Sequence, residues 1–183
     1  AGRAVAAPPV VAAGRLEGPW GRAVRAYKQD PAPELGRLLA GPLLSWLDHP
    51  ALSGVELQLA PVPMAAVRRR ERGVNPAERL AEILARPPAR RVCRGALRRV
   101  RYRRPLRGLG AADRLREVAG AFAAAAGDRA GAGPAAGRRA ARFALVDDVF
   151  TTGATLAAAA GALTAAGHSP AVAFALGRTP RRS

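Results

Sequence analysis

The chain has 183 residues, a formal net charge of +17 and a single cysteine, Cys93. Its length suits one domain with a buried core, and one cysteine excludes an internal disulfide and the common zinc sites built on several cysteines. No run reaches the ~18 apolar residues that a membrane span needs, and Ala1–Val11 lacks the long apolar stretch of a signal peptide. We therefore expect a cytoplasmic protein with no membrane insertion.

The positive charge is carried almost wholly by arginine and is unevenly distributed. Of the 30 lysine and arginine residues, only Lys28 is lysine. Codon usage in a GC-rich genome explains such a composition as readily as function does. The stretch Arg68–Arg116, however, holds 17 arginines against four acidic residues. This local excess indicates attraction to a phosphate-bearing partner, either a small molecule or a polymer.

In chain order, the spacing of apolar residues predicts two strands and three helices in the first half. They are an edge strand at Val10–Ala13, helices at Gly18–Lys28 and Glu34–Leu47, a strand at Val55–Ala60, and a helix from Pro76 to about Arg86. Pro42 marks a kink or a boundary inside the second helix, and Asn75 is the expected N-cap of the third. Trp20 and Trp46 are expected to pack in the core.

The second half begins with weaker patterns. They are a candidate strand at Val92–Val100, a helical composition at Ala111–Val118, a strand or a helix at Gly120–Ala126, and a linker without regular structure at Gly127–Gly137. A sharper pattern follows, with a strand at Phe143–Val146, a helix from Gly153 to about Ala166, Gly167 after its end, and a strand at Ala171–Leu176. Short connections make this last part a right-handed βαβ unit. His49 and His168 are expected at the surface.

Two acidic residues and a phosphate-loop pattern lie at the end of the Phe143–Val146 strand. Asp147 and Asp148 follow the strand directly, where ligands bind in open α/β sheets. Thr-Thr-Gly-Ala-Thr (151–155) then leads into the predicted helix, whose first backbone N–H groups suit a phosphate. The Gly-Lys-Ser/Thr ending of a Walker A loop is absent. A simple helix cap in a turn is the alternative interpretation.

The acid pair has two uses beside a phosphate. Its carboxylates can accept hydrogen bonds from ribose hydroxyls, or they can hold a hydrated Mg²⁺. Successive strand residues point in different directions, so we do not expect Asp147 and Asp148 to share a proton.

These residues carry a resemblance to a known family. The segment LVDDVFTTGAT is similar to the phosphoribosyl pyrophosphate (PRPP) signature of type I phosphoribosyltransferases. Over about Val10–Arg178 the chain resembles the ComF family of competence-associated, amidophosphoribosyltransferase-like proteins. The supporting stretches are Glu17–Pro19, Ala26–Lys28, Pro61–Pro63, Arg72–Glu78, Gly108–Arg114 and Gly120–Phe122. The block Arg-Gly-Val-Asn at 72–75 is what narrows the likeness to ComF.

The resemblance implies a fold and a division of the chain. The fold would be α/β and type I phosphoribosyltransferase-like, with a mostly parallel central sheet flanked by helices. Residues 1–50 would form an N-terminal strand and helical hood, and residues 51–183 the core domain. Arg103–Val118 matches the mobile loop that closes over the site in this fold. Many relatives carry a cysteine-rich zinc segment that has no counterpart here, so no zinc is expected.

The resemblance also implies residue roles. Asp147 and Asp148 would be the catalytic pair that contacts the ribose hydroxyls and binds Mg²⁺. The 5-phosphate would be held by Thr151, Thr152, Gly153, Ala154 and Thr155. The pyrophosphate would be approached by the turn Pro61, Val62 and Pro63 and neutralised by Arg72.

Two functions follow from the resemblance. One is transfer of the phosphoribosyl group from PRPP with Mg²⁺, as in glycosyltransferases, with release of pyrophosphate; no residue identifies the acceptor. The family usually has Gln and Asn where Leu106 and Glu117 stand, a departure that affects turnover more than PRPP binding.

The alternative is a PRPP- or nucleotide-binding competence factor without turnover, acting with a helicase in uptake of single-stranded DNA. Its DNA affinity would depend strongly on salt. A third alternative is a protein that keeps the fold but has a degraded site. Assembly as a homodimer is also left open.

Overall fold

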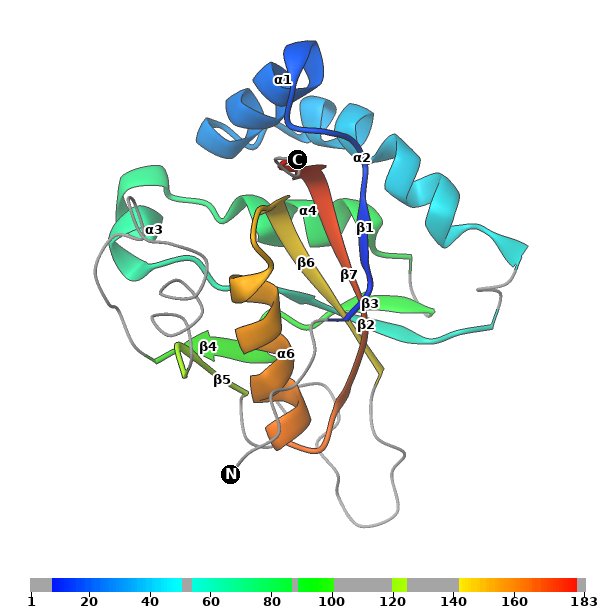
Figure 1. The fold of residues 1–183 in the computed structure, drawn as a ribbon, viewed down its shortest axis with the longest axis vertical. Helices are drawn as coiled ribbons and strands as arrows, with labels where there is room; N and C mark the ends of the chain where they lie inside the picture. Colours follow the sequence, from blue (N-terminus) through cyan, green and yellow to red (C-terminus); the bar gives the residue numbers. More distant parts are fainter. Residues whose placement is uncertain (1–7, 51–53, 87–88, 101–119, 125–141, 181–183) are drawn as a thin grey trace.

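The computed structural model describes residues 8–50, 54–86, 89–100, 120–124 and 142–180. Its centre is a parallel sheet with strand order β1-β7-β6-β2-β3 (Figure 1). The strands are β1 (Val10–Ala12), β2 (Leu57–Pro61), β3 (Arg90–Val92), β6 (Arg142–Phe150) and β7 (Ser169–Arg178). An antiparallel pair, β4 (Leu97–Arg99) and β5 (Phe122–Ala124), lies outside this sheet. The expected α/β class with a mostly parallel central sheet is confirmed.

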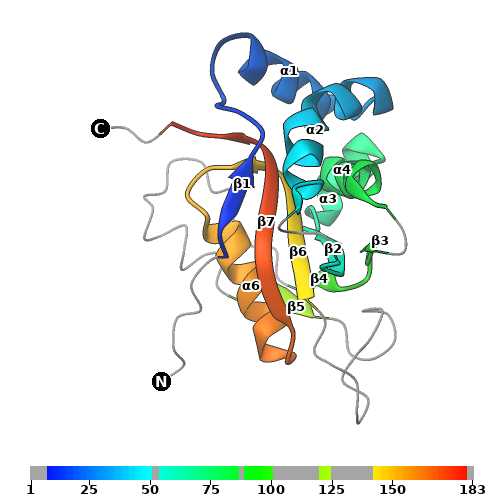
Figure 2. The same ribbon diagram turned by 90° about the vertical axis from the view of Figure 1, so that its right-hand side faces the viewer.

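Five helices in the described residues flank the sheet. They are α1 (Gly18–Gln29), α2 (Pro33–Leu47), α3 (Ala66–Arg72), α4 (Pro76–Leu84) and α6 (Ala154–Ala165). Figure 2 shows α6 on one face of the sheet and α2 and α4 on the other. In Figure 1, α1 lies beyond the carboxyl ends of β6 and β7. No helix in these parts of the chain has the length and apolar character to cross a membrane.

Strand alternation divides the apolar residues of β6 between two cores. Ala144 and Val146 pack with α2, α4 and the end of α1, whereas Phe143 and Leu145 pack with α6 and the β4–β5 pair. All four side chains are fully buried. Because burying a large apolar side chain contributes about 1.5–3 kcal/mol, these two cores fix β6 as the central strand of the sheet.

The predicted strand–helix–strand unit is present as β6, α6 and β7. The two strands are parallel neighbours from Arg142 to Phe150, so β6 runs further than predicted and includes both acidic residues. Gly167 ends α6 as expected: it has a φ of +81°, and its N–H donates to the carbonyl of Thr164 at 2.9 Å. The following N–H, of His168, donates to Leu163 at 3.0 Å. This double closure is a Schellman motif, for which glycine is favoured.

In the middle of the chain one predicted strand was wrong and one helix was not predicted. Val92–Val100 is not one strand, because the chain turns between β3 and β4, and these strands belong to different sheets. The helix α3 was missed, because none of its residues is buried and it therefore shows no apolar periodicity. The open choice at Gly120–Ala126 is settled as strand over Phe122–Ala124. The predicted helix Ala111–Val118, linker Gly127–Gly137 and loop Arg103–Val118 lie outside the described residues.

Two side-chain predictions were wrong. His168 is buried, because the Schellman motif turns it inward against Phe143, with ring centroids 5.0 Å apart; burial lowers its pKa. Trp46 is 37% exposed and its ring forms a T-shaped pair with that of Phe174, whereas Trp20 is half-buried and donates to the carbonyl of Leu176 at 2.9 Å. The division at residue 50 stays a prediction, although β1 pairs with β7 in the central sheet.

Candidate functional site

The acid pair lies at the topological switch point of the sheet. From β2 the chain crosses to β3 on one side, and from β6 it crosses to β7 on the other. The pairing of β2 with β6 ends at Pro61 and Val146. Asp147 and Asp148 therefore project beyond the last β2 partner, at the carboxyl edge where the two crossovers diverge. In open α/β sheets this is where ligands bind.

The predicted pyrophosphate turn stands directly beside the acid pair. The N–H of Val62 donates to the carbonyl of Val146 at 2.8 Å. The buried side chain of Asn75 joins this turn to α4: its Nδ2 donates to Val62 at 3.0 Å, and its Oδ1 accepts from the N–H of Ala77 at 3.1 Å. Asn75 is therefore the expected N-cap of α4, and it also fixes the turn.

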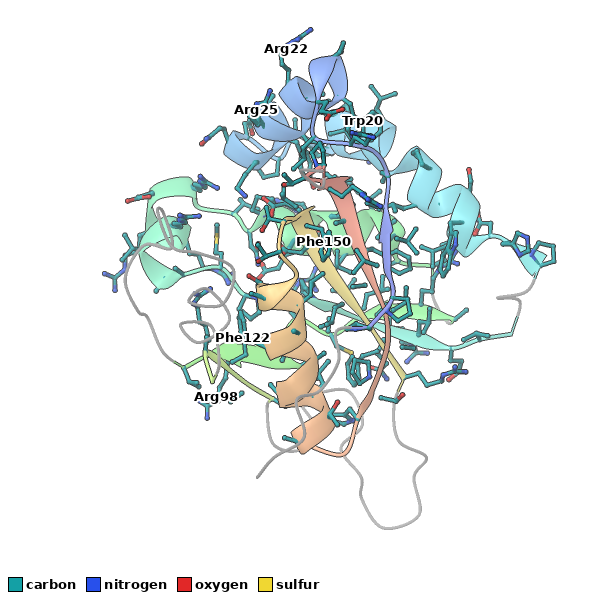
Figure 3. All side chains as sticks on the ribbon, viewed as in Figure 1. Trp20, Arg22, Arg25, Arg98, Phe122 and Phe150 are labelled. Atoms are coloured by element: carbon teal, nitrogen blue, oxygen red, sulfur yellow. The ribbon has the colours of Figure 1, made fainter. Side chains whose placement is uncertain are left out.

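The predicted phosphate loop begins where β6 ends. Thr151 and Thr152 are exposed, and Gly153 is the N-cap of α6 with a φ of +80°. A Cβ at Gly153 would lie 3.0 Å from the ring of Phe150, whose position at this junction is seen in Figure 3. Gly153 provides no side-chain acceptor to the first N–H groups of α6. Those N–H groups and the positive end of the helix dipole suit an anion.

A lysine from the N-terminal part of the chain reaches the acid pair. Lys28, near the end of α1, places its Nζ 3.0 Å from Oδ2 of Asp148, and the two side chains are 32% and 13% exposed. The backbone carbonyl of Lys28 accepts a hydrogen bond from Arg72 at 3.1 Å. The end of α1 is thus bonded both to β6 and to the end of α3.

The two carboxyl groups influence each other. Burial of its carboxyl group, and next the negative charge of Asp148, raise the pKa of Asp147 well above its usual range, while the ammonium of Lys28 opposes them. Oδ1 of Asp147 accepts from the N–H of Asp148 at 2.9 Å, which turns the first side chain back toward the second residue. Strand alternation alone predicts side chains directed apart, and this hydrogen bond accounts for the difference.

Tyr27 lies against the same site and is fully buried. Its hydroxyl donates to the carbonyl of Pro76 at 3.3 Å. Burial, and then the charge of Asp148, raise the pKa of this phenol. Tyr27 therefore stays neutral and serves to pack the end of α1 onto the start of α4.

Several arginines follow the predicted pyrophosphate turn along the chain. The helix α3 follows this turn and carries Arg68, Arg69, Arg70 and Arg72. Arg69 pairs with Glu78 at 3.1 Å, and Arg72 bonds to Lys28. Arg68 and Arg70 are exposed. Of these arginines, Arg72 is the one bonded to the segment that carries Lys28.

The residues predicted for the site fall into two groups. Asp147, Asp148 and the loop 151–155 are continuous along the chain, and Pro61–Pro63 is brought beside them by the β2–β6 pairing. Arg72 reaches the acid pair through Lys28 rather than directly. The mobile-loop positions lie outside the described residues. Lys28 was not predicted as a site residue, although its being the only lysine of 30 basic residues was an available signal.

The acid pair does not suit a metal held by the protein alone. In the described ranges no three acidic, cysteine or histidine side chains gather as metal ligands. Asp148 is already paired with an ammonium group, and the pKa of Asp147 is raised, which favours the protonated form. Magnesium ions at nucleotide sites are commonly held by one or two carboxylates together with phosphate oxygens. A Mg²⁺ here would have to arrive with such oxygens on the ligand.

Cys93 does not have the environment of an activated nucleophile. It is buried, its Sγ donates to the side-chain oxygen of Gln58, and burial raises its pKa. A reactive cysteine needs the opposite shift and partial exposure.

Comparison with known proteins gives no match, either among protein-family models or among curated sequences.

Proposed function

We propose that this protein binds PRPP at the carboxyl edge of β6 and β2, and transfers its phosphoribosyl group with release of pyrophosphate. The observation that carries the proposal is one continuous arrangement: an acid pair at the switch point of a parallel sheet, followed at once by a glycine-capped helix N-terminus. An acid pair suits ribose hydroxyls, and the helix N-terminus suits a 5-phosphate.

The surrounding residues supply complementary charge in this proposal. Ribose hydroxyls donate to Asp147 and Asp148, while Thr151, Thr152 and the first N–H groups of α6 donate to the 5-phosphate. The pyrophosphate group lies toward the turn after β2 and the arginines of α3. During transfer the bond from C1 to pyrophosphate breaks, a bond from C1 to the nucleophile forms, and pyrophosphate leaves with the electron pair. Arginines and any Mg²⁺ that PRPP brings would stabilise the developing charge.

The first test is direct binding. The protein is expected to be stabilised by PRPP with Mg²⁺, because a ligand that binds only the folded state raises its stability by about 2.7 kcal/mol at a hundredfold excess over Kd. Thermal unfolding and titration calorimetry measure the two quantities. Ribose 5-phosphate and pyrophosphate, tested separately, identify which half of PRPP is recognised. No response to millimolar PRPP contradicts the proposal.

Turnover is tested on the same material. Pyrophosphate release is measured with PRPP and a panel of nucleobases and ammonia as acceptors. Release with one of these acceptors identifies the transferase reaction. PRPP binding without release supports a phosphosugar- or nucleotide-binding protein instead.

A second candidate function, contact with single-stranded DNA, has one observation in its favour. The arginines of α3 stand on a helix none of whose residues is buried. Backbone binding of this kind releases counterions, so affinity for an oligonucleotide should fall by tenfold or more from about 50 to 200 mM salt. Fluorescence anisotropy measures the slope. A flat response contradicts this candidate and leaves PRPP binding unaffected.

A further inference from the structure

We propose that Lys28 is the resident cation of the acid pair, and that it competes with divalent metal ions for Asp148. This inference rests on the proposed function in one respect: it assigns to Lys28 the role of letting the ribose phosphate half of the ligand bind without a metal. The competition itself is a property of the ligand-free protein and can be measured without any sugar phosphate.

Lys28 is paired with a carboxylate oxygen that a metal ion at the acid pair would need. Its Nζ is 3.0 Å from Oδ2 of Asp148, on the carboxyl side of the switch point. Asp148 is 13% exposed, so screening by water is much weaker than at a surface pair. An ammonium group and a hydrated divalent ion need the same carboxylate oxygens. Binding of the ammonium group to these oxygens therefore weakens binding of the divalent ion, and the reverse also holds.

The segment that carries Lys28 is held by two hydrogen bonds and by the burial of Tyr27. Arg72 donates to the Lys28 carbonyl at 3.1 Å, the Tyr27 hydroxyl donates to Pro76 at 3.3 Å, and Tyr27 is fully buried. These contacts involve the backbone of Lys28 and the neighbouring residue, so they persist when the Lys28 side chain is replaced. The end of α1 thus delivers one positive charge to a fixed place.

The chain offers a matched comparison. Lys28→Met removes the ammonium and keeps an unbranched side chain with good helix propensity. Arg22→Met removes one positive charge from the same helix, at an exposed side chain that points away from the sheet in Figure 3. Both variants have the same net charge. A difference between them therefore reports the place of the charge rather than its amount.

The first arm uses Mn²⁺ alone, which takes oxygen ligands as Mg²⁺ does. The electron paramagnetic resonance signal of free Mn²⁺ measures binding to the parent protein and to both variants. We expect Lys28→Met to bind Mn²⁺ about fivefold or more tightly than the parent, because a competing ion pair has been removed. Arg22→Met should match the parent to within about twofold. Equal Mn²⁺ affinity in Lys28→Met and Arg22→Met overturns the proposal.

The second arm uses ribose 5-phosphate with EDTA, by calorimetry. The parent and Arg22→Met are expected to bind it, and Lys28→Met about tenfold more weakly, with Mg²⁺ recovering part of the loss. If the parent needs Mg²⁺ to bind ribose 5-phosphate, the metal-substituting role is wrong. If no protein binds the sugar phosphate while Lys28→Met gains Mn²⁺, the proposed function fails and the competition by Lys28 stands.

Discussion

Replacing both acidic residues of the site, Asp147→Asn and Asp148→Asn, should abolish PRPP binding while leaving the fold intact. Asp148 would lose charge-assisted hydrogen bonds of about 1.5–3 kcal/mol from the ribose hydroxyls, and Asp147 would lose at least neutral ones of about 0.5–1.5 kcal/mol. The double variant should therefore bind PRPP at least a hundredfold more weakly. Calorimetry with PRPP and Mg²⁺ measures this loss. Asp30→Asn, which removes an exposed carboxylate just after α1, is the charge control and should bind like the parent.

The single variant Asp147→Asn separates binding from stability. Because the pKa of Asp147 is raised in the folded protein, its ionisation at neutral pH costs folding stability, and the asparagine avoids this cost. The Asn Oδ1 can still accept from the N–H of residue 148. The variant should therefore be more stable than the parent at pH 7 and yet bind PRPP poorly.

The difference in stability between Asp147→Asn and the parent should depend on pH. The stability advantage of Asp147→Asn over the parent should be largest above the folded pKa of Asp147. It should shrink as the pH falls toward the ordinary carboxyl value of about 3.9, where the parent residue is protonated in both states. Urea unfolding at several pH values measures the difference. A variant less stable than the parent at pH 7 would show that the Asp147 carboxylate is favourably solvated.

The elements predicted most accurately are those for which the local sequence pattern and burial indicate the same structure. The strand before Asp147 is fully apolar, Gly153 and Gly167 bound α6 with positive φ, and the βαβ unit formed as expected. The middle of the chain was predicted less well. Exposed α3 has no apolar period, and dense arginine hid the turn that separates β3 from β4. Burial decides such segments, and burial depends on the whole fold.

In the candidate site, too, the features contained in a local sequence pattern were predicted, and those that depend on the whole fold were not. The acid pair and the phosphate loop are adjacent in sequence, so a local pattern could indicate them. Lys28 reaches Asp148 only because α1 lies beyond the carboxyl end of β6, an arrangement that no local pattern contains. The side-chain bond from Asn75 to Val62 likewise depends on where α4 meets the turn after β2. The N-cap role of Asn75 was predictable, and its second contact was not.

Because Asn75 makes both contacts, its replacement should have a large effect on the stability of the protein. Asn75→Ala removes the cap on Ala77 and leaves the carbonyl of buried Val62 without its side-chain donor. Loss of the cap costs about 0.5–2 kcal/mol, and an unsatisfied buried polar group costs about 1–3 kcal/mol. We expect the free energy of unfolding to fall by roughly 2–4 kcal/mol in urea titrations. A fall below about 1 kcal/mol would contradict the bridging role of Asn75.

Asn75→Ser divides this loss into its two parts. Serine keeps an acceptor for the N–H of Ala77, but it has no amide to donate to Val62. Its stability should therefore lie between those of the parent and Asn75→Ala. Because the turn at Pro61–Pro63 is no longer held to α4, Asn75→Ser should also bind pyrophosphate more weakly than the parent. Ser45→Ala loses only an exposed hydrogen bond to Gly41 and is the control, with a change within about 0.5 kcal/mol. If Asn75→Ser matches the parent in pyrophosphate affinity, the turn keeps its shape through the Val62–Val146 bond alone.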